Sequence, residues 1–176
     1  MKKIFFSVLT ISGMLFANAS NAQNQLVALS SKSFVPKTGS STSSSAEMST
    51  FASTNPKAYK SFVSQYSNIS DISVTNGKTS SIVVFKNAEI LTRVCYDMKG
   101  ECLNTIRYYD AAMLPQSAKD AIKADYAGYS IFGVTEVTIN GKTGYVVKIE
   151  NEKYWKTVKV ADGETEETEK FVKANP

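Results

Sequence analysis

Val74–Asn87 reads VTNGKTSSIVVFKN, and Thr138–Asn151 reads TINGKTGYVVKIEN. These two stretches decide the predicted fold, because they are nearly the same and align without a gap at an offset of 64 positions. A repeat at a fixed spacing is typical of an architecture built from similar units. The sequence therefore predicts two similar modules in tandem.

Around the first copy, the pattern predicts one helix followed by four strands. Asn55-Pro56 suits a helix start, because Asn caps helices well and Pro has no N–H to leave unpaired at the first helical position. Asn76-Gly77 is typical of a type I′ turn, since both residues tolerate positive φ. The expected strands are Ile69–Thr75, Thr79–Phe85, Ala88–Tyr96 and Glu101–Tyr109. This first module covers residues 56–110.

The second module, residues 111–176, repeats the same order of elements. Leu114-Pro115 opens the expected helix and Gly128 ends it, while Asn140-Gly141 and Asp162-Gly163 make turns. The expected strands are Ser130–Ile139, Lys142–Glu150, Lys153–Ala161 and Glu164–Val172. Each module is thus a helix plus a four-stranded antiparallel meander, and the fold class is α+β.

Alternation of apolar residues assigns the two faces of the sheet. Val83 and Phe85 in the first module, like Val147 and Ile149 in the second, are expected to face the helix. The opposite parity puts a second set of side chains on the other face: Leu91, Arg93, Cys95, Val146, Lys148, Trp155, Thr157 and Lys159. One helix per module covers only one face, so the other face must meet solvent, the other module or a partner.

The beginning of the chain predicts export. Lys2-Lys3 is followed by the apolar run Ile4–Phe16 and by small residues, which together predict a signal peptide over residues 1–22. Cleavage after Ala22 is favoured, and cleavage after Ala19 is the alternative. The mature protein is then expected in the periplasm or secreted, with no membrane span. Residues 23–55 are rich in Ser and Thr and predict a flexible segment.

The composition excludes several classes of function. With 20 basic and 16 acidic residues, the chain lacks the clustered basic charge that nucleic-acid binding needs. It has no histidine, the commonest general base and metal ligand. The two Gly-Lys-Thr triplets are not phosphate loops, because Ile72 and Glu136 stand where a glycine is required. We therefore expect no catalytic residues, no cofactor, no metal and no enzyme.

The order and spacing of several short motifs resemble a known family. In the second module these are Leu114-Pro115, Tyr145-Val146-Val147, Trp155-Lys156-Thr157-Val158 and Asp162-Gly163, and in the first module Val83-Val84-Phe85 and Tyr96-Asp97-x-x-Gly100. Over roughly residues 57–172 the chain resembles the PepSY-like proteins of Gram-negative bacteria, also described as β-lactamase-inhibitor-like. The resemblance implies two tandem modules that form one long curved sheet with helices on one face. It also implies non-catalytic binding, without a particular target.

Cys95 and Cys102 flank the turn at 97–100, and the strand register decides whether they bond. If Tyr96 pairs with Glu101, the cysteines lie opposite each other and a disulfide is feasible in an exported protein. If Gly100 forms a bulge and Asp97 pairs with Glu101, they point to opposite faces. The apolar pattern prefers this second register, which is expected to turn Ile106 and Tyr108 toward the helix together with Ile90 and Val94.

A run of carboxylates near the end of the chain has two interpretations. Glu164, Glu166, Glu167 and Glu169 could bind calcium, but such a run is more often a solvated strand face that protects an edge.

The leading functional hypothesis is an exported, non-enzymatic binding protein, with inhibition of a partner as one form of that binding. It holds a protein partner on the face without helices, where Trp155, Lys148 and Lys159 are expected, because exposed Trp, Tyr and Arg dominate interface hot spots. Tyr108, Tyr109 and Tyr129 are further candidate binding residues. The alternative is a small-ligand or cell-envelope binder that uses a groove between the modules around these three tyrosines.

Overall fold

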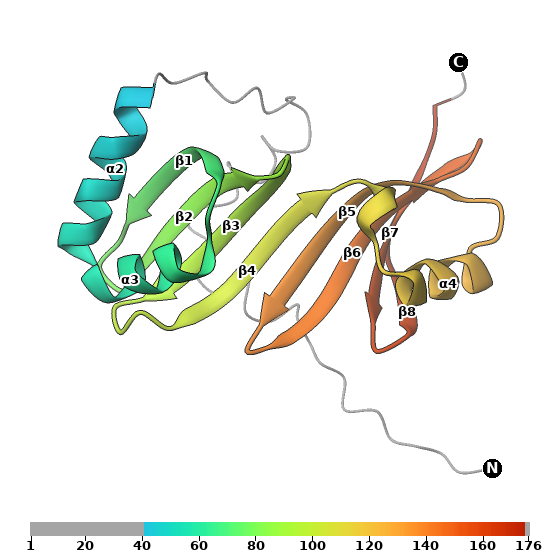
Figure 1. The fold of residues 1–176 in the computed structure, drawn as a ribbon. Coiled ribbons are helices and arrows are strands. Elements are labelled where there is room, and N and C mark those ends of the chain that lie inside the picture. The colour runs from blue at the N-terminus through green and yellow to red at the C-terminus, as the bar shows by residue number, and fades with distance from the viewer. Residues whose placement is uncertain (1–40, 175–176) are drawn as a thin grey trace, which may run out of the picture. The chain divides into compact units, whose positions relative to one another are not determined.

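The computed structural model describes residues 41–174, with side chains described from residue 45, and it is an eight-stranded sheet with three α-helices (Figure 1). The helices are α2 (Ser41–Thr54), α3 (Pro56–Gln65) and α4 (Gln116–Asp125), and a 3-10 turn, η2, covers Ala111–Met113. The strands are β1 (Ile69–Asn76), β2 (Ser80–Asn87), β3 (Ile90–Asp97), β4 (Cys102–Tyr109), β5 (Ser130–Ile139), β6 (Lys142–Glu150), β7 (Tyr154–Ala161) and β8 (Glu164–Val172).

All eight strands follow one another in a single antiparallel sheet, in the order β1 to β8. The sheet continues from the first repeat into the second, because β4 pairs with β5 from Asn104–Ile139 to Tyr109–Val134. The predicted α+β class is therefore confirmed. The predicted boundary between two modules at residue 110 falls in the connection from β4 through η2 to α4.

The first hydrophobic core lies between β1–β3 and the helices α2 and α3. Its fully buried residues are Phe51, Ala58, Phe62, Val83, Phe85, Val94 and Tyr96. Phe62 packs edge-on against Phe85, with ring centroids 5.2 Å apart. Burial of such a side chain contributes about 2–3 kcal/mol, so these rings anchor α3 to the sheet.

Helix α2 corrects the expectation of a flexible segment through Asn55. Residues 41–54 are helical, and Phe51 is fully buried with its ring 5.9 Å from that of Tyr59 and 6.1 Å from that of Phe62. Glu47 also accepts a hydrogen bond from the backbone N–H of Val74 on the edge strand β1. The Ser/Thr-rich composition concealed a helix that tertiary contacts stabilise. The rest of that segment, with the predicted signal peptide, lies outside the described residues.

The second core lies between α4 and β5–β7. Its buried residues are Leu114, Ala118, Ile122, Val134, Val147, Ile149, Val158 and Val160. Strand register places this core on the same side of the sheet as the first, because Val94 is aligned with Thr105 and then with Thr138 across β3, β4 and β5. The helix-facing residues predicted from alternation, such as Val83, Phe85, Val147 and Ile149, are confirmed.

The start of α3 follows the sequence prediction. Asn55 is the N-cap, and its side-chain oxygen accepts a hydrogen bond from the N–H of Ala58. Helix α4 begins at Gln116, one residue after the predicted Leu114-Pro115 start, and ends at Asp125, before Gly128. No helix within residues 41–174 is long and apolar enough to cross a membrane.

Two turns differ from the prediction. Asn76 and Gly77 lack the positive φ angles of a type I′ turn, and residues 77–79 instead form a longer loop in which Gly77 donates to the carbonyl of Ser80. In the first repeat, two successive positive φ angles are found instead at Ala88 (φ 46°) and Glu89 (φ 68°), in the turn between β2 and β3. Asn140-Gly141 and Asp162-Gly163 turn as expected.

A bulge in β4 overturns the predicted orientation of Ile106 and Tyr108. Asp97 donates to the carbonyl of Glu101, as in the second predicted register, and Tyr96 then pairs with Cys102. Between Cys102 and Asn104 the pairing slips by one residue, so that Ile106 lies opposite Arg93 and Tyr108 opposite Leu91. A slip of one residue turns every later side chain to the other face. Ile106 and Tyr108 therefore face away from the helices.

Candidate binding surface

The open face is the side of the sheet opposite α3 and α4, and in the described residues no helix covers it. Its side chains follow from register, as the alternates of the buried residues of the two cores. On β2–β6 they are Ser80, Ile82, Val84, Lys86, Leu91, Arg93, Cys95, Asp97, Asn104, Ile106, Tyr108, Ser130, Gly133, Thr135, Val137, Ile139, Lys142, Gly144, Val146, Lys148 and Glu150. On β7 and β8 they are Trp155, Thr157, Lys159, Ala161, Glu164, Glu166, Glu169 and Phe171.

The centre of the open face is apolar. Ile106, Val137 and Val146 lie on three adjacent strands, and Tyr108 stands beside them with 41% of its surface exposed. The aliphatic side chains here are half-buried by their neighbours in the sheet. Apolar side chains that no helix covers make this part of the sheet a candidate site for another molecule.

The cations of the open face divide into paired and unpaired groups. Lys86 is bound to Asp71 at 3.0 Å, and Lys159 to Glu166 at 3.3 Å. Arg93, Lys142 and Lys148 make no ion pair or side-chain hydrogen bond with any described residue. The unpaired guanidinium and ammonium groups surround the apolar centre and remain available to a ligand.

Trp155 lies on the open face, as predicted, with 45% of its surface exposed. Its indole N–H donates to Glu150 over 2.8 Å, and the ammonium of Lys173 lies 5.2 Å from the ring centroid. Lys173 also binds Glu150 at 2.7 Å. The hydrogen bond from Lys173, followed by that from Trp155, lowers the pKa of the Glu150 carboxyl. The ring is thus held in a fixed orientation.

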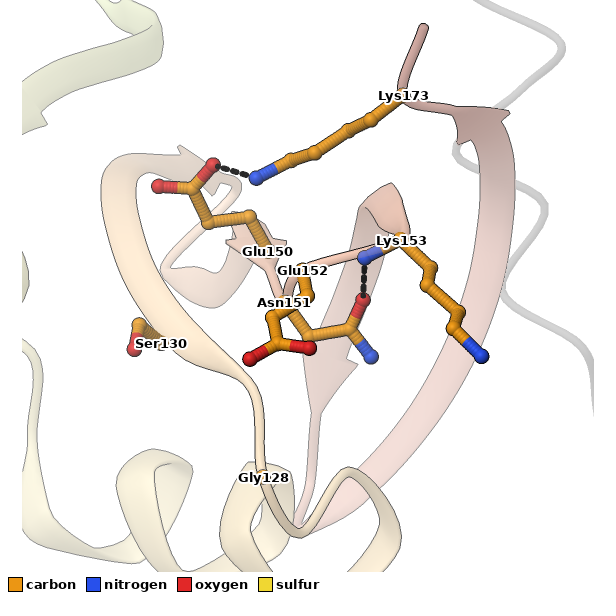
Figure 2. A pocket seen from close by; sticks show the side chains of 7 residues that line it. All are labelled: Gly128, Ser130, Glu150, Asn151, Glu152, Lys153 and Lys173. Carbon is orange, nitrogen blue, oxygen red and sulfur yellow. Dashed lines mark hydrogen bonds and ion pairs between the residues drawn. The ribbon is translucent and has the colours of Figure 1, made fainter. Parts of the chain in front are cut away.

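A hollow of about 640 Å³ adjoins this group at the end of β6 (Figure 2). It is lined by Gly128, Ser130, Glu150, Asn151, Glu152, Lys153 and Lys173. Asn151 is occupied within the turn, where its side chain accepts from the N–H groups of Lys153 and Tyr154. The hollow is broad, polar and confined to one end of the second repeat, so it does not form the groove expected between the repeats.

Tyr108, Tyr109 and Tyr129 do not come together. Tyr108 lies on the open face, whereas Tyr109 and Tyr129 pack on the second core, on the helix side. The predicted groove around these three tyrosines is therefore not formed. A separate hollow of about 350 Å³ does lie on the helix side near the junction of the repeats, lined by Tyr66, Asn87, Ala88, Ile90, Thr92 and Arg107.

Tyr109 belongs to a polar network that the sequence did not reveal. Its hydroxyl donates to Glu136 over 2.6 Å, and Arg107 donates to the other carboxylate oxygen over 3.0 Å. Burial and the adjacent Glu136 carboxylate raise the pKa of Tyr109. The side chain of Glu136 is only 14% exposed, so the network holds β4 to β5 rather than offering a free carboxylate.

Tyr129 is engaged in a similar way. The Lys156 ammonium lies 5.0 Å from the Tyr129 ring centroid and 5.1 Å from that of Tyr126, and it binds Glu167 at 2.6 Å. The hydrogen bond to Glu167 raises the pKa of Lys156. No pattern in the sequence indicated these contacts of Lys156, because they join the residues that follow α4 to residues of β7 and β8.

The carboxylates of β8 face both sides of the strand and are largely engaged by neighbours. Glu166 binds Lys159, Glu167 binds Lys156, and Glu169 accepts from Thr157 over 2.9 Å. Within residues 45–174, no group of three or more potential ligand side chains could hold a metal ion. The solvated-edge interpretation of this run is thus the one that the geometry favours.

Both cysteines are free, and Cys95 is buried while Cys102 is exposed. Cys102 pairs with Tyr96 on the helix side, whereas Cys95 lies on the open face opposite Ile82. The feasible disulfide is therefore not formed, because the register turns the two side chains to opposite faces.

No protein-family model matches the chain, and a search of the curated proteins gave no match. The resemblance to PepSY-like proteins therefore stays a prediction.

The fold itself has solved relatives. A BLIP-like protein from Bacteroides fragilis is 14% identical, with a TM-score of 0.51 over 69% of this chain and 87% of its own. A DUF2874 family protein from Bacteroides uniformis is 12% identical, with a TM-score of 0.51 over 66% and 87%. A putative periplasmic protein from Bacteroides eggerthii is 13% identical, with a TM-score of 0.50 over 66% and 86%. At these identities the likeness shows a shared fold.

Proposed function

We propose that this chain is an exported, non-enzymatic binding protein that holds a protein partner against its open face. The observation that carries the proposal is the uncovered apolar centre around Ile106, Val137 and Val146, with Tyr108 and Trp155 exposed on the same face. Aromatic side chains with Arg on a surface of this kind are the usual anchors of protein interfaces.

The engagement of the titratable groups supports binding rather than catalysis. The shifted pKa values of Glu150 and Lys156 come first from hydrogen bonds to Lys173 and Glu167, and that of Tyr109 comes first from burial and then from its hydrogen bond to Glu136, so each shift has a structural cause within the fold. A catalytic acid or base would instead be aimed into a cleft with its proton available to a substrate.

Export and inhibitor-like binding rest on different supports. The basic and apolar beginning of the chain supports export, and the fold shared with a protein described as periplasmic agrees with it. The fold shared with a BLIP-like protein agrees with an inhibitor-like role. The partner is expected among proteins of the same compartment.

The test is affinity capture from an envelope extract of the source organism. The mature protein is compared with a Tyr108→Ala, Trp155→Ala double variant and with a control, Val63→Ala, Met113→Ala, which removes two equally exposed apolar side chains outside the sheet. We expect one protein to be retained by wild type and control but lost by the open-face variant. Equal capture by the open-face variant, with its melting temperature unchanged, would contradict the proposal.

A further inference from the structure

We propose that the partner presents an acidic segment bearing apolar side chains, and that this segment binds the centre of the open face on β3–β6. The inference rests on the proposed function and adds the chemistry of the partner and the place where it binds. It follows from how charge and apolar surface are distributed over the face.

The first observation is an excess of positive charge over the central strands. Open-face positions of β2–β6 hold four cations, Lys86, Arg93, Lys142 and Lys148, and two carboxylates, Asp97 and Glu150. Asp97 lies at the end of β3, where it accepts hydrogen bonds from the backbone N–H groups of Lys99 and Glu101 in the turn. Glu150 already accepts from Lys173 and Trp155, and Lys86 is paired with Asp71. Three unpaired cations remain, so an acidic partner would gain ion pairs there while a basic partner would be repelled.

The second observation is that most of the acidic side chains of the open face lie on the edge strand. Glu164, Glu166 and Glu169 belong to β8, at the far side of the sheet from Arg93. An acidic segment is repelled by this edge and attracted by the centre. The charge pattern therefore selects the surface of β3–β6 rather than strand addition along β8.

The third observation concerns what lies between the cations. Ile106 and Tyr108 on β4 and Thr135 on β5 lie between Arg93 and Lys148, with Val137 and Val146 alongside. These residues offer mostly apolar surface instead of further charge. From strand spacing and rise per residue, the Cα atoms of Arg93 and Lys148 are about 20 Å apart. An extended segment of about six residues spans that distance, with acidic side chains at its ends and apolar ones between. A nucleic-acid backbone would leave the aliphatic centre without a matching surface.

The proposal is tested with two labelled peptides of about seven residues that carry the same Val and Phe residues in their middle. One has Glu at both ends and the other has Lys there, and binding is followed by fluorescence anisotropy. A single-stranded oligonucleotide of similar length serves as the third probe. We expect the acidic peptide to bind at least about tenfold more tightly than the basic one, more weakly as salt is raised, and the oligonucleotide not to compete.

The variants separate a local effect from net charge. The double variant Arg93→Glu, Lys148→Glu should bind the acidic peptide at least about tenfold more weakly than wild type. Lys60→Glu, Lys123→Glu changes the net charge equally, at exposed positions on α3 and α4, and should leave its binding unchanged. Equal loss in both variants, tighter binding of the basic peptide, competition by the oligonucleotide, or no binding of the acidic peptide would each overturn the proposal.

The envelope capture distinguishes this failure from failure of the proposed function. One outcome is that the double variant Arg93→Glu, Lys148→Glu still retains the partner that the double variant Tyr108→Ala, Trp155→Ala loses. In that case the open face binds a protein, but not through acidic side chains of that protein. If both variants retain it, the open face itself is not the binding site.

Discussion

Gly100 and Lys57 approach each other so closely that a Cβ on Gly100 would lie 2.7 Å from the carbonyl carbon of Lys57. Gly100 also has a φ angle of +84°, and its carbonyl accepts a hydrogen bond from Ser61 over 2.9 Å. The turn between β3 and β4 thus contacts the first turn of α3 directly. Only a residue without a side chain permits that contact.

Gly100→Ala should therefore cost more than an ordinary substitution at positive φ. The left-handed backbone alone costs about 1 kcal/mol, and the forced separation from Lys57 should bring the loss to about 2–4 kcal/mol. Gly163→Ala is the matched control, because Gly163 has φ +81° and a Cβ added there would have no atom within 4 Å. Urea unfolding of both variants measures the difference, and equal losses would show that the contact with Lys57 is unimportant.

Asn55 should be the most sensitive polar residue of the first repeat. Its side-chain oxygen caps α3 at Ala58, and its amide donates to Ser81 over 3.2 Å and to the carbonyl of Asp97 over 3.0 Å. Loss of a helix cap together with buried unpaired groups should lower the free energy of unfolding of Asn55→Ala by about 2–4 kcal/mol.

Asn55→Asp distinguishes the cap from the amide bonds. It keeps an oxygen for Ala58 but removes both amide donors and buries a charge next to the Asp97 carbonyl. We expect Asn55→Asp to be at least as destabilising as Asn55→Ala near pH 7 in thermal unfolding. Wild-type stability of Asn55→Asp would mean that the cap alone matters.

Local signals and repeat symmetry predicted the strands, the α3 cap and the two faces, because alternation and capping depend on neighbours in sequence. The predictions were wrong where a contact with a residue distant in sequence determines the local structure. Phe51 makes residues 41–54 a helix by packing under α3, and one extra residue in β4 turns Tyr108 to the open face. The ion pairs of Lys156 and Glu136 likewise join separate elements, so no short window of sequence contains them.

Tyr96 offers a stabilising substitution. It is fully buried, and its hydroxyl has no hydrogen-bond partner among the described residues. Because an unpaired buried hydroxyl costs about 1–2 kcal/mol, Tyr96→Phe should raise the free energy of unfolding by about that amount. A loss of stability in urea unfolding would contradict this account of the site.

The same hydroxyl contributes to the alkaline limit of stability. Burial, and then the nearby Tyr66, raise the pKa of Tyr96 above its ordinary value. As pH rises, the unfolded chain therefore loses the Tyr96 proton before the folded chain does. Ionisation of Tyr96 then favours the unfolded state, so the free energy of unfolding is unaffected by this group below about pH 10 and declines above it. The melting temperature of Tyr96→Phe should fall less steeply than that of wild type between about pH 9.5 and 11. Parallel curves would exclude Tyr96 as a source of the decline.

The Tyr109–Glu136 hydrogen bond should appear as coupling between the two residues. Tyr109→Phe and Glu136→Gln each disturb the same 2.6 Å contact, so their effects should not add. A double-mutant cycle in urea should give a coupling energy of about 1 kcal/mol or more. Additive losses would show that Glu136 acts through Arg107 alone.

The turn at Ala88-Glu89 leaves room for improvement by substitution. Both residues have positive φ, and Asn87 pairs directly with Ile90, which is the geometry of a two-residue type I′ hairpin. Neither Ala nor Glu favours the left-handed region, whereas Asn-Gly does. Replacing the pair with Asn-Gly should raise the free energy of unfolding by about 1–2 kcal/mol.

The control for that replacement is Lys78-Thr79→Asn-Gly in the preceding loop, where neither residue has positive φ. There the added glycine increases the freedom of the unfolded chain without relieving strain, so the control should be neutral or destabilising. Thermal unfolding of the two variants side by side tests the assignment. A gain in the control, or none at Ala88-Glu89, would mean that strain at the turn is not what limits stability.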